Sequence, residues 1–582
     1  MGKRPVQGDP TTKLWVKIVC GFLGFMMVFG ILVMVFSAFQ SSAIESESSV
    51  AVPDQQISVG LYCNENAVQS YALTAENGFT VAVGSTALSV SLPSPQITAT
   101  VDNNLYRVGS NLYTESGGIA TVGGYHIEIS YFTFADLGID TDHDNPVFIR
   151  PGNSVGTTDG YAPSTVHEYI EMLSDDNTFK ALSLYAFPYY ASAQKCYIRV
   201  GSFFTRQEAE EVLAQLERTI AITAKIAEPG QDTISILGED YSILCELYGK
   251  DQDLYVSTLQ SKGMRSIGGP AYDGTIQISS YNGSGRQRLN IVNRLSLETY
   301  ISILLPSEVY SGWNIELLKS MAVLLRTEIT RKLGSHAKEG YDLCAESHCH
   351  TYIGAAEVSQ PILDAVSETA GQILTYEGEL IYTPYSMTVG SGTLSSADAF
   401  GTYLPYLSGI YTPWEEAEDW TVEFTPYELY RLLNGSGYGQ ISGNIASVTV
   451  NCYAEHSDYV NSITFTDLFG NAATIEGSEA IRLLFGGKLL STCFVVGLAG
   501  ETAERPTRKL SGSSLDYTES VETITLSGTY GSFVFCGRGS GCGVGFSVMG
   551  AKKLAEMGLD YKQILLTYFP NVKVSSADSE EE

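Results

Sequence analysis

The feature that most constrains this chain is a stretch of 22 residues, 18–39, without a single charged side chain. At about 1.5 Å per residue, a helix of this length spans the roughly 30 Å hydrocarbon core of a bilayer. Residues 1–17 contain four basic side chains and one acidic side chain, a net charge of 4 − 1 = +3. By the positive-inside rule, we expect a transmembrane helix over 18–39, with the N-terminus cytoplasmic and the remaining chain outside.

A cleaved signal peptide is the alternative interpretation of the same stretch. The apolar region of a signal peptide usually has about 7–15 residues and is shorter than this one. Ala38 and Ala43 leave cleavage open, although no clear small-x-small site follows at the usual distance. We therefore predict an uncleaved single-pass anchor in the cell membrane, followed by extracytoplasmic domains.

The charge of the whole chain excludes one class of partner. Its 34 basic and 65 acidic residues give a net charge of −31, so the residues after 17 sum to −34. A surface this acidic repels phosphate backbones, and no basic subdomain offsets it, so we expect no nucleic-acid partner. With 44% hydrophobic and 17% charged residues, the chain has the composition of a folded protein.

Short β-type runs such as 79–83 and 125–132, broken by Gly, Asn and Ser, dominate the first part of the chain. Together with a few functional helices further on, they predict an α+β fold. The expected organisation is a cytoplasmic tail (1–17), the transmembrane helix (18–39), a linker (40–57), a β-rich region (58–190), a small module (191–260), a catalytic domain (270–575) with an insertion at about 415–530, and an acidic tail (576–582).

The small module begins with a strand pattern at 196–203 and continues into an Ala- and Leu-rich helix pattern at 205–219. Thr205 and Glu208 suit a capping box at the start of that helix. This strand, turn and helix resemble the first half of a SPOR domain, which binds peptidoglycan glycan strands. An ordinary βα unit is the alternative.

A longer helix is predicted after Asn314, a plausible N-cap, with Leu317, Met321 and Leu324 in its apolar stripe. Lys319 and Arg326 are seven residues apart and therefore point the same way. Two cations on one helical face indicate a nearby anion or polar ligand, and a solvated face is the alternative.

Several motifs in order resemble stage II sporulation protein D, of the SpoIID/LytB family. They are LETYISILLPSEVYSGWNIELLKSMAVLLRT (297–327), Tyr352-x-Gly354, the run Tyr385 to Thr393 with its Gly-Ser-Gly-Thr end, and GRGSGCGVGFSV (537–548). The resemblance covers about 285–410 and 530–574. It implies a peptidoglycan lytic transglycosylase that acts on glycan strands stripped of their peptides, and it puts Glu308 at the catalytic position.

The chemistry of such an enzyme needs only one carboxylate. The acid protonates the leaving glycosidic oxygen and then accepts the proton of the sugar's 6-hydroxyl, which attacks in place of water and gives a 1,6-anhydro end. An acid of this kind must stay protonated, which an apolar setting favours. Neighbours that could supply this setting are Pro306, Val309, Tyr310 and Trp313. A solvated loop carboxylate is the alternative for Glu308.

The resemblance also implies substrate contacts. The residues that match these family positions are Lys319, Arg326, Tyr352, Ser391, Gly392 and Thr393. Hydroxyls and backbone amides of the Gly-Ser-Gly-Thr run could bond sugar oxygens, and a plain turn is the alternative.

A Cys- and His-rich segment suggests a metal site. Three of the seven histidines and two of the ten cysteines lie within 336–350. Thiolate and imidazole ligands in a set of four favour tetrahedral Zn²⁺. The segment resembles a zinc site of two His and two Cys that some family members have just before the Tyr-x-Gly motif. By position, the residues that match these ligands are His336, Cys344, His348 and Cys349, and His350 stands where the family more often has Gln. We expect a structural zinc ion; a Cys344–Cys349 disulfide is the alternative.

The C-terminal motif departs from the family pattern, because Cys542, Phe546 and Val548 replace its usual His, Met and Gln. This departure puts activity in doubt, and Cys542 could instead pair with Cys536. It favours a second function, a non-catalytic glycan-binding partner that recruits or stimulates a cell-wall amidase. A third possible function is that of a scaffold in the cell envelope.

Overall fold

The computed structural model describes most of the chain beyond residue 54. The described ranges are 55–84, 89–101, 105–108, 111–114, 124–132, 170–171, 173–192, 195–219, 222–230, 232–250, 253–259, 263–283, 286–355, 358–390, 392–454, 457–500, 522–525 and 531–576.

The expected single N-terminal transmembrane helix is not supported. Within the ranges just given, no helix combines the length and the apolar character needed to cross a membrane. The segment 18–39, on which the expectation depends, lies outside those ranges. The fold class is therefore corrected to a β-rich fold with helices.

One sheet of the described chain joins strands from distant parts of the sequence. In spatial order its seven strands are β19 (Leu343–Cys344), β1 (Gln56–Tyr62), β18 (Arg286–Ser296), β17 (Thr275–Gly283), β14 (Leu254–Thr258), β3 (Phe79–Val83) and β4 (Ser89–Leu92). In β17, Ile276 and Ile278 are buried on one face, as the two-residue period of a strand requires. The strand β1 pairs with both β18 and β19, so the first described strand is built into the region predicted to be catalytic.

A ten-stranded sheet contains the strand and helix predicted for the small module. Its order is β11 (Ile222–Ala227), β8 (Tyr125–Phe132), β10 (Lys195–Phe203), β9 (Ala186–Ser192), β13 (Ile243–Tyr248), β12 (Thr233–Leu237), β5 (Gln96–Val101), β2 (Ser70–Thr74), β15 (Met264–Ser266) and β16 (Ala271–Tyr272). The helix α4 (Arg206–Thr219) follows β10, and the amide of Glu208 donates to the hydroxyl of Thr205 at 3.1 Å. Since strands on both sides of residue 190 interleave, the two predicted regions share one sheet. A short helix, α3 (Asn177–Ala181), precedes β9, and β6 (Leu105–Val108) pairs with β7 (Asn111–Thr114).

Charged side chains lie in the interior of this ten-stranded sheet. Arg199 on β10 donates to Glu246 on β13 at 2.7 Å and to Glu128 on β8 at 3.2 Å. Nε2 of His126 lies 3.3 Å from the carboxylate of Glu246, and the hydroxyl of Ser235 donates to the same carboxylate. Each buried acid therefore has a charged or hydrogen-bonding partner, as burial requires.

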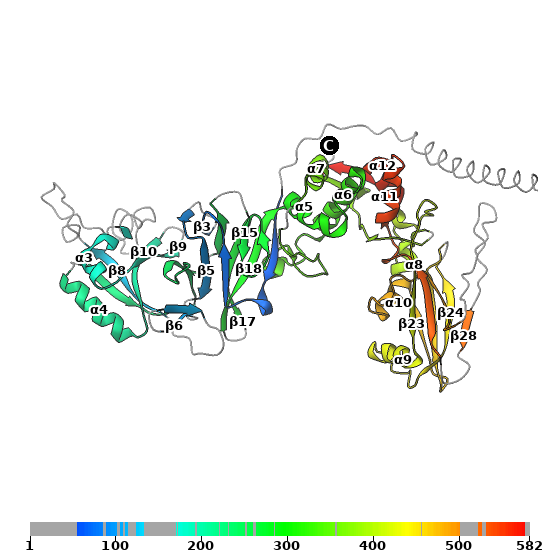
Figure 1. Cartoon of the computed structure of the whole chain (residues 1–582), viewed down its shortest axis with the longest axis horizontal. Helices are drawn as coiled ribbons and strands as arrows, with labels where there is room; N and C mark the ends of the chain where they lie inside the picture. Colours follow the sequence, from blue (N-terminus) through cyan, green and yellow to red (C-terminus); the bar gives the residue numbers. More distant parts are fainter. Residues whose placement is uncertain are drawn as a thin grey trace, which may run out of the picture. The chain divides into compact units, whose positions relative to one another are not determined.

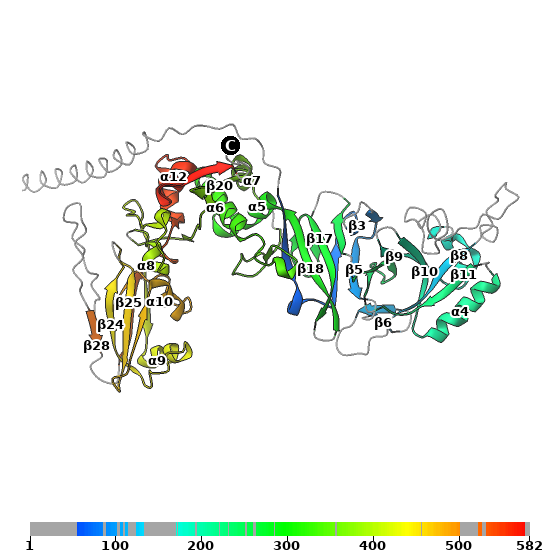
Figure 2. The ribbon, with the colours of Figure 1, turned by 180° about the vertical axis from the view of Figure 1, so that it is seen from behind.

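The region that carries the predicted site is built mainly from a group of helices (Figures 1 and 2). They are α5 (Leu297–Glu308), α6 (Ile315–Lys332), α7 (Gln360–Glu368), α11 (Val548–Glu556) and α12 (Tyr561–Tyr568), and α6 contacts each of the other four. The predicted start of α6 is confirmed, because the amide of Glu316 donates to Oδ1 of Asn314 at 2.9 Å. The predicted stripe Leu317, Met321 and Leu324 is fully buried. Short strands complete this region: β20 (Gln372–Tyr376) between β21 (Glu379–Leu380) and β31 (Lys573–Ser576), and β22 (Tyr385–Ser386) beside β30 (Phe546–Ser547).

A second hydrophobic core forms from the stretch predicted as an insertion, about 415–530, together with the strand just after it, and its members include Phe424, Leu429, Phe465 and Phe535. Its strands are β23 (Asp419–Phe424), β29 (Phe533–Arg538) and β27 (Phe494–Leu498) in one sheet, and β26 (Ala472–Glu476), β25 (Val460–Asp467), β24 (Ile445–Tyr453) and β28 (Glu522–Thr525) in another. Its helices are α9 (Pro426–Gly435) and α10 (Ser478–Leu484), and α10 packs against α8 (Ser396–Phe400) (Figure 1).

Candidate functional site

Glu308 is the last residue of α5. This helix begins at the N-cap Ser296, whose hydroxyl accepts from the amide of Thr299 at 3.1 Å, and most of it is buried. Its C-terminal end carries Glu308, a half-buried side chain at the point where the helix reaches the surface. The packing of α5 thus holds this carboxylate at a defined place.

The side chain of Tyr385 lies near the carboxylate of Glu308 and can donate a hydrogen bond to it. Burial and the neighbouring Glu308 charge both raise the pKa of Tyr385, so its hydroxyl stays protonated and can only donate here. The strand β22 holds Tyr385 in place through its parallel pairing with Phe546 of β30. Sequence motifs alone did not assign Tyr385 a role, although it lies in the quoted run 385–393.

The predicted apolar setting of Glu308 is formed only in part. Val309 is buried, but Pro306 and Tyr310 are exposed, Tyr310 by 68%. Trp313 packs its edge against the ring of Tyr310 at 6.4 Å between centroids. The polar neighbour of the carboxylate is instead the hydroxyl of Tyr385.

Lys319 lies in a cluster of ion pairs that joins helices. Its ammonium group is 3.0 Å from Glu316 and 2.7 Å from Glu368 of α7, and it lies over the ring of Tyr561 of α12. The same Glu316 accepts from the amide of Tyr561 at 2.9 Å. This placement favours a structural role, and substrate contact by Lys319 stays a prediction.

Arg326 is the largest fully buried side chain, with 1% exposure. Its guanidinium donates to both carboxylate oxygens of Glu298, at 2.8 and 2.6 Å, and to the backbone oxygens of Gln372 and Val366. These bonds tie α6 to α5, α7 and β20. The alternative of a solvated face therefore does not apply to Arg326. Its contact with substrate stays a prediction, and the burial of the side chain does not favour it.

The remaining predicted substrate residues are engaged in the fold. The hydroxyl of Tyr352 is buried and donates to Asn293 at 2.8 Å. The hydroxyl of Thr393 accepts from the amide of Ile410 at 2.9 Å, and a side chain at Gly392 would meet the backbone of Ile410 at 2.5 Å. Ser391 lies outside the described residues. The predicted contact of these residues with glycan stays a prediction.

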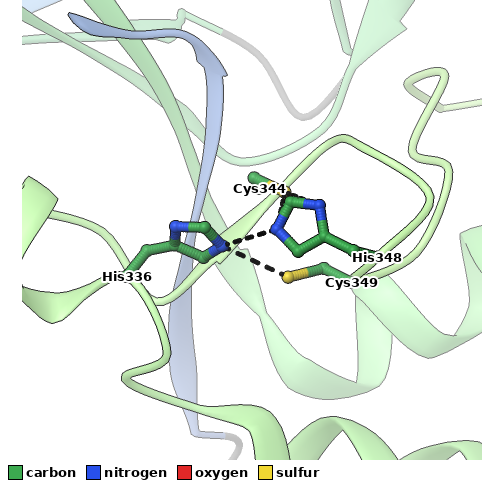
Figure 3. Close-up of side chains that lie close together, drawn as sticks. All are labelled: His336, Cys344, His348 and Cys349. Atoms are coloured by element: carbon green, nitrogen blue, oxygen red, sulfur yellow. Dashed lines mark hydrogen bonds between the residues drawn. The ribbon is translucent and has the colours of Figure 1, made fainter. Parts of the chain in front are cut away.

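The four predicted metal ligands come together. One ligand atom from each of His336, Cys344, His348 and Cys349 lies within 4.8 Å of the other three (Figure 3). The measured separations are 3.1 Å between the two Nε2 atoms, 3.2 Å from the Cys344 sulfur to His348, and 3.5 Å from the Cys349 sulfur to His336. Both cysteines are free thiols, so the alternative disulfide is absent from the structure.

The three short separations are close to the edges of a tetrahedral zinc site, and all pairs lie within 4.8 Å. Zn–N and Zn–S bonds of about 2.0–2.3 Å imply ligand–ligand edges of about 3.3–3.8 Å. Nδ1 of His336 lies 3.0 Å from the carboxylate of Glu339, which also accepts from the hydroxyl of Tyr341 at 2.5 Å. A proton held on Nδ1 leaves the lone pair of Nε2 free to face the cluster. The chemistry of the set therefore fits Zn²⁺, and Glu339 is a supporting residue that spacing alone did not indicate.

The cluster is anchored from two sides. Cys344 lies on β19, where it pairs with Gly60 of β1, and the ring of Tyr341 packs so close to Gly60 that a Cβ there would lie 2.8 Å from it. From the other side, the ammonium of Lys332, at the end of α6, donates to the backbone oxygens of His348 and Cys349 at 3.2 Å. The metal loop is thus joined to the first described strand and to the helix that follows Glu308.

His350 lies apart from these four ligands. Its Nε2 is buried without a hydrogen-bond partner in the described chain. Burial lowers the pKa of His350 to about 4, helped by the charge of Lys332, so the ring is neutral near pH 7.

The C-terminal motif lies beside β22, because its strand β30 pairs with β22. Phe546 and Val548, two of the three departures from the family pattern, are buried, and Cys542 lies 3.8 Å from the hydroxyl of Ser386. Cys536 and Cys542 are both free, so the disulfide considered between them does not form in the structure. The amide of Gly543 also donates to Ser386, at 2.9 Å.

A buried carboxylate, Glu415, connects this motif to the run 385–393. It accepts from the amide of Val389 at 2.8 Å and from the hydroxyl of Ser547 at 2.7 Å. Burial raises the pKa of Glu415. No sequence pattern marked this residue, because its partners are 26 and 132 positions away.

Comparison with known proteins agrees with the resemblance. Residues 285–376 match the model of the Stage II sporulation protein family, SpoIID. The chain is 26% identical to an uncharacterized protein of Brachyspira hyodysenteriae over 53% of this chain and 73% of that protein. It is 24% identical to stage II sporulation protein D of Bacillus subtilis, over 50% of this chain and 77% of that protein.

A third relative is the amidase enhancer of Bacillus subtilis, 23% identical over 47% of this chain. The match spans only 40% of the length of that protein. The predicted resemblance is confirmed by these matches, which support a SpoIID-family assignment.

Proposed function

We propose that this protein is a peptidoglycan lytic transglycosylase that cleaves peptide-stripped glycan strands, with Glu308 as the only general acid and base. The family assignment and the amidase enhancer relative support a cell-wall related role. The observation that carries the finer proposal is the placement of Tyr385 near Glu308, a carboxylate at a helix end inside the segment that matches the family. Glycan in the wall lies outside the cytoplasm, and we propose that the protein acts there.

The proposed reaction uses one carboxyl group twice. Glu308 donates its proton to the glycosidic oxygen as the bond from the anomeric carbon to that oxygen breaks. The carboxylate then accepts the proton of the muramyl 6-hydroxyl, whose oxygen bonds to the anomeric carbon and closes the 1,6-anhydro ring. No water is consumed, and Glu308 ends in its starting protonation state.

Tyr385 has a positioning role in this scheme. Its hydroxyl holds one orientation of the Glu308 carboxylate through both proton transfers. The other carboxylate near Tyr385 is Glu328, which is engaged by Arg331 at 2.9 Å and by Lys332 at 3.3 Å. This engagement leaves Glu308 as the candidate acid.

We also propose that the cluster His336, Cys344, His348 and Cys349 holds a structural Zn²⁺. When bound, the ion would cross-link the loop after α6, which carries His336, to β19 and the segment that follows it. The reaction above needs no metal, because the sugar hydroxyl is the nucleophile. The proposal is supported by the geometry of the four ligand atoms and by the Glu339 contact on His336.

A second candidate function is a non-catalytic glycan-binding partner that stimulates a cell-wall amidase. Two observations favour it: the amidase enhancer relative, and the replacement of the usual His and Gln by Cys542 and Val548.

One experiment separates the two functions. The full chain and its Glu308→Gln variant are incubated with peptide-free glycan strands, and the products are analysed by mass spectrometry. The proposal expects 1,6-anhydro ends from the wild-type protein and none from the variant. Binding without such products, together with faster glycan-peptide cleavage by an added amidase, would replace the enzyme with the amidase partner.

A further inference from the structure

Two aromatic side chains adjoin each other in the turn between α5 and α6. Tyr310 is 68% exposed, and Trp313 is half-buried. Their ring centres lie 6.4 Å apart, and the ring planes meet at 80°. Single exposed rings are common on protein surfaces, whereas contiguous exposed apolar surface marks ligand sites. We call Tyr310 and Trp313 the aromatic pair.

The backbone places the first ring of this pair on the same side as the candidate acid. Val309, between Glu308 and Tyr310, ends α5 in an extended conformation with φ −140° and ψ 148°. The neighbours of an extended residue point to one side of the chain, and their Cα atoms lie about 7 Å apart. Val309 itself points the other way and is buried in the core. The Tyr310 ring is therefore the next large side chain along the surface from the Glu308 carboxylate.

The turn holds the aromatic pair in a fixed position. The amide of Trp313 donates to the backbone oxygen of Tyr310 at 3.0 Å. The Tyr310 ring lies so close to Gly312 that a Cβ there would be 2.6 Å from Cε1 of the ring. The side chain of Asn314 donates to the backbone oxygen of Ala555 at 3.3 Å and so ties the turn to α11 (Figure 1). A surface that is already in place loses little conformational entropy when a ligand binds to it.

The cation beside the aromatic pair already has a partner. The ammonium group of Lys552, on α11, lies 6.0 Å from the ring centre of Trp313. It also lies 2.7 Å from the carboxylate of Glu556, one turn further along the same helix. The charge of Lys552 is thus paired, and its ammonium group lies over the ring of Trp313. The open ring of the pair is therefore Tyr310, which can recognise a ligand by apolar contact rather than by ionic charge.

A sugar ring suits such a surface. The face of a pyranose carries C–H groups, whose weakly positive hydrogens can contact the negative face of an aromatic ring. Both sugars of a glycan strand have this face, and the lactyl group of muramic acid is not part of it. Resting on the proposed function, we propose that the Tyr310 ring, supported by Trp313, stacks on the sugar residue next to the bond that Glu308 acts on. Tyr310 thereby positions the strand for cleavage.

The test measures affinity by calorimetry on the full chain carrying Glu308→Gln, the parent chain, so that no probe is consumed. The probes are chitotetraose and a peptide-free tetrasaccharide of alternating N-acetylglucosamine and N-acetylmuramic acid. We expect Tyr310→Ala in the parent chain to weaken the binding of both probes by about three- to ten-fold, the range of one aromatic contact. The loss should be the same at about 0.05 and 0.5 M salt, because no charged group is removed.

Two further variants assign the loss to the ring. Tyr310→Phe should bind like the parent chain, because the ring remains and only the hydroxyl is removed. The matched control is Tyr427→Ala on α9, since Tyr427 is 54% exposed and its ring lies 6.1 Å from that of Tyr430, three positions further on. This control should also bind like the parent chain. Circular dichroism of each variant checks folding, which the loss of an exposed ring at position 310 should not disturb.

The outcomes separate this inference from the proposed function. Equal affinity of Tyr310→Ala and the parent chain, or a loss in Tyr310→Phe as large as in Tyr310→Ala, would overturn the inference while leaving glycan cleavage in place. Absence of binding of either probe to the parent chain would also overturn it. The proposed function would be overturned with it only if the wild-type protein released no 1,6-anhydro ends.

Discussion

The side chain of Tyr385 lies near the carboxylate of Glu308 and interacts with it electrostatically, across 77 positions of the sequence. This interaction joins the end of α5 to β22, and β22 is in turn paired with the C-terminal motif through β30. The polar neighbour of the candidate acid is therefore a residue whose own position depends on the C-terminal motif.

Removal of the Tyr385 hydroxyl should slow cleavage and spare binding. In Tyr385→Phe, the carboxylate loses a donor worth about 1.5 kcal/mol, so we expect the rate of 1,6-anhydro release to fall about ten-fold. Affinity for peptide-free strands should stay within about two-fold. The control is Tyr427→Phe, at an exposed tyrosine of α9, which should cleave at the wild-type rate. An unchanged rate in Tyr385→Phe would remove Tyr385 from the site.

Zinc binding should depend on Glu339 as well as on the four ligands. Because Glu339 contacts Nδ1 of His336, Glu339→Gln should weaken zinc binding by about ten- to one hundred-fold, measured by competition with a chromophoric chelator. Affinity should also fall as the pH is lowered, since thiolate and neutral imidazole are the binding forms. His350→Ala, which removes a histidine outside the cluster, should keep its zinc. Less than a tenth of an equivalent of zinc in the purified wild-type protein would count against the site.

Arg326 should matter to stability more than to glycan affinity. Loss of its guanidinium would leave Glu298 without its charged partner in a largely buried site, so Arg326→Met should reduce the free energy of unfolding by about 3 kcal/mol. Urea denaturation followed by circular dichroism measures the loss. The double variant Arg326→Met, Glu298→Leu should recover part of it, because no unpaired charge remains. A strong loss of glycan affinity in a stably folded Arg326 variant would restore the predicted substrate contact.

The buried charges of the ten-stranded sheet should give an acid-sensitive region. Burial alone would raise the pKa of Glu246, but His126 and Arg199 outweigh it and lower the pKa from 4.5 to about 2. The folded state therefore binds the proton less readily than the unfolded state. The stabilising contribution of Glu246 is complete above about pH 4.5 and is lost as the pH falls towards about 2.

Hydrogen exchange of β10 and β13 between pH 2 and 5 measures this loss. Glu246→Gln should destabilise these strands by about 3 kcal/mol at pH 6 and remove most of their pH dependence in the acid range. Glu217→Gln, on the exposed face of α4, should behave like the wild-type protein. Acid sensitivity that persists in Glu246→Gln would assign it to other groups.

Local patterns were sufficient where the cause is local. The cap at Asn314 and the buried stripe of α6 follow from the helical period and from hydrogen bonds between near neighbours. The four metal-ligand candidates lie within 14 positions, so a short loop can bring them together. The family motifs, too, are contiguous runs, and the family was confirmed from them.

Only the tertiary structure decided what surrounds these elements. Helical spacing puts Lys319 and Arg326 on one side of α6, but it does not predict their partners. In the structure, Lys319 pairs with Glu316 and Glu368, and Arg326 pairs with Glu298. Nor could helical spacing bring Tyr385 near Glu308. The backbone period acts over a few residues, whereas these contacts arise when helices and sheets from distant segments bury their apolar faces together and leave particular polar groups in reach of one another.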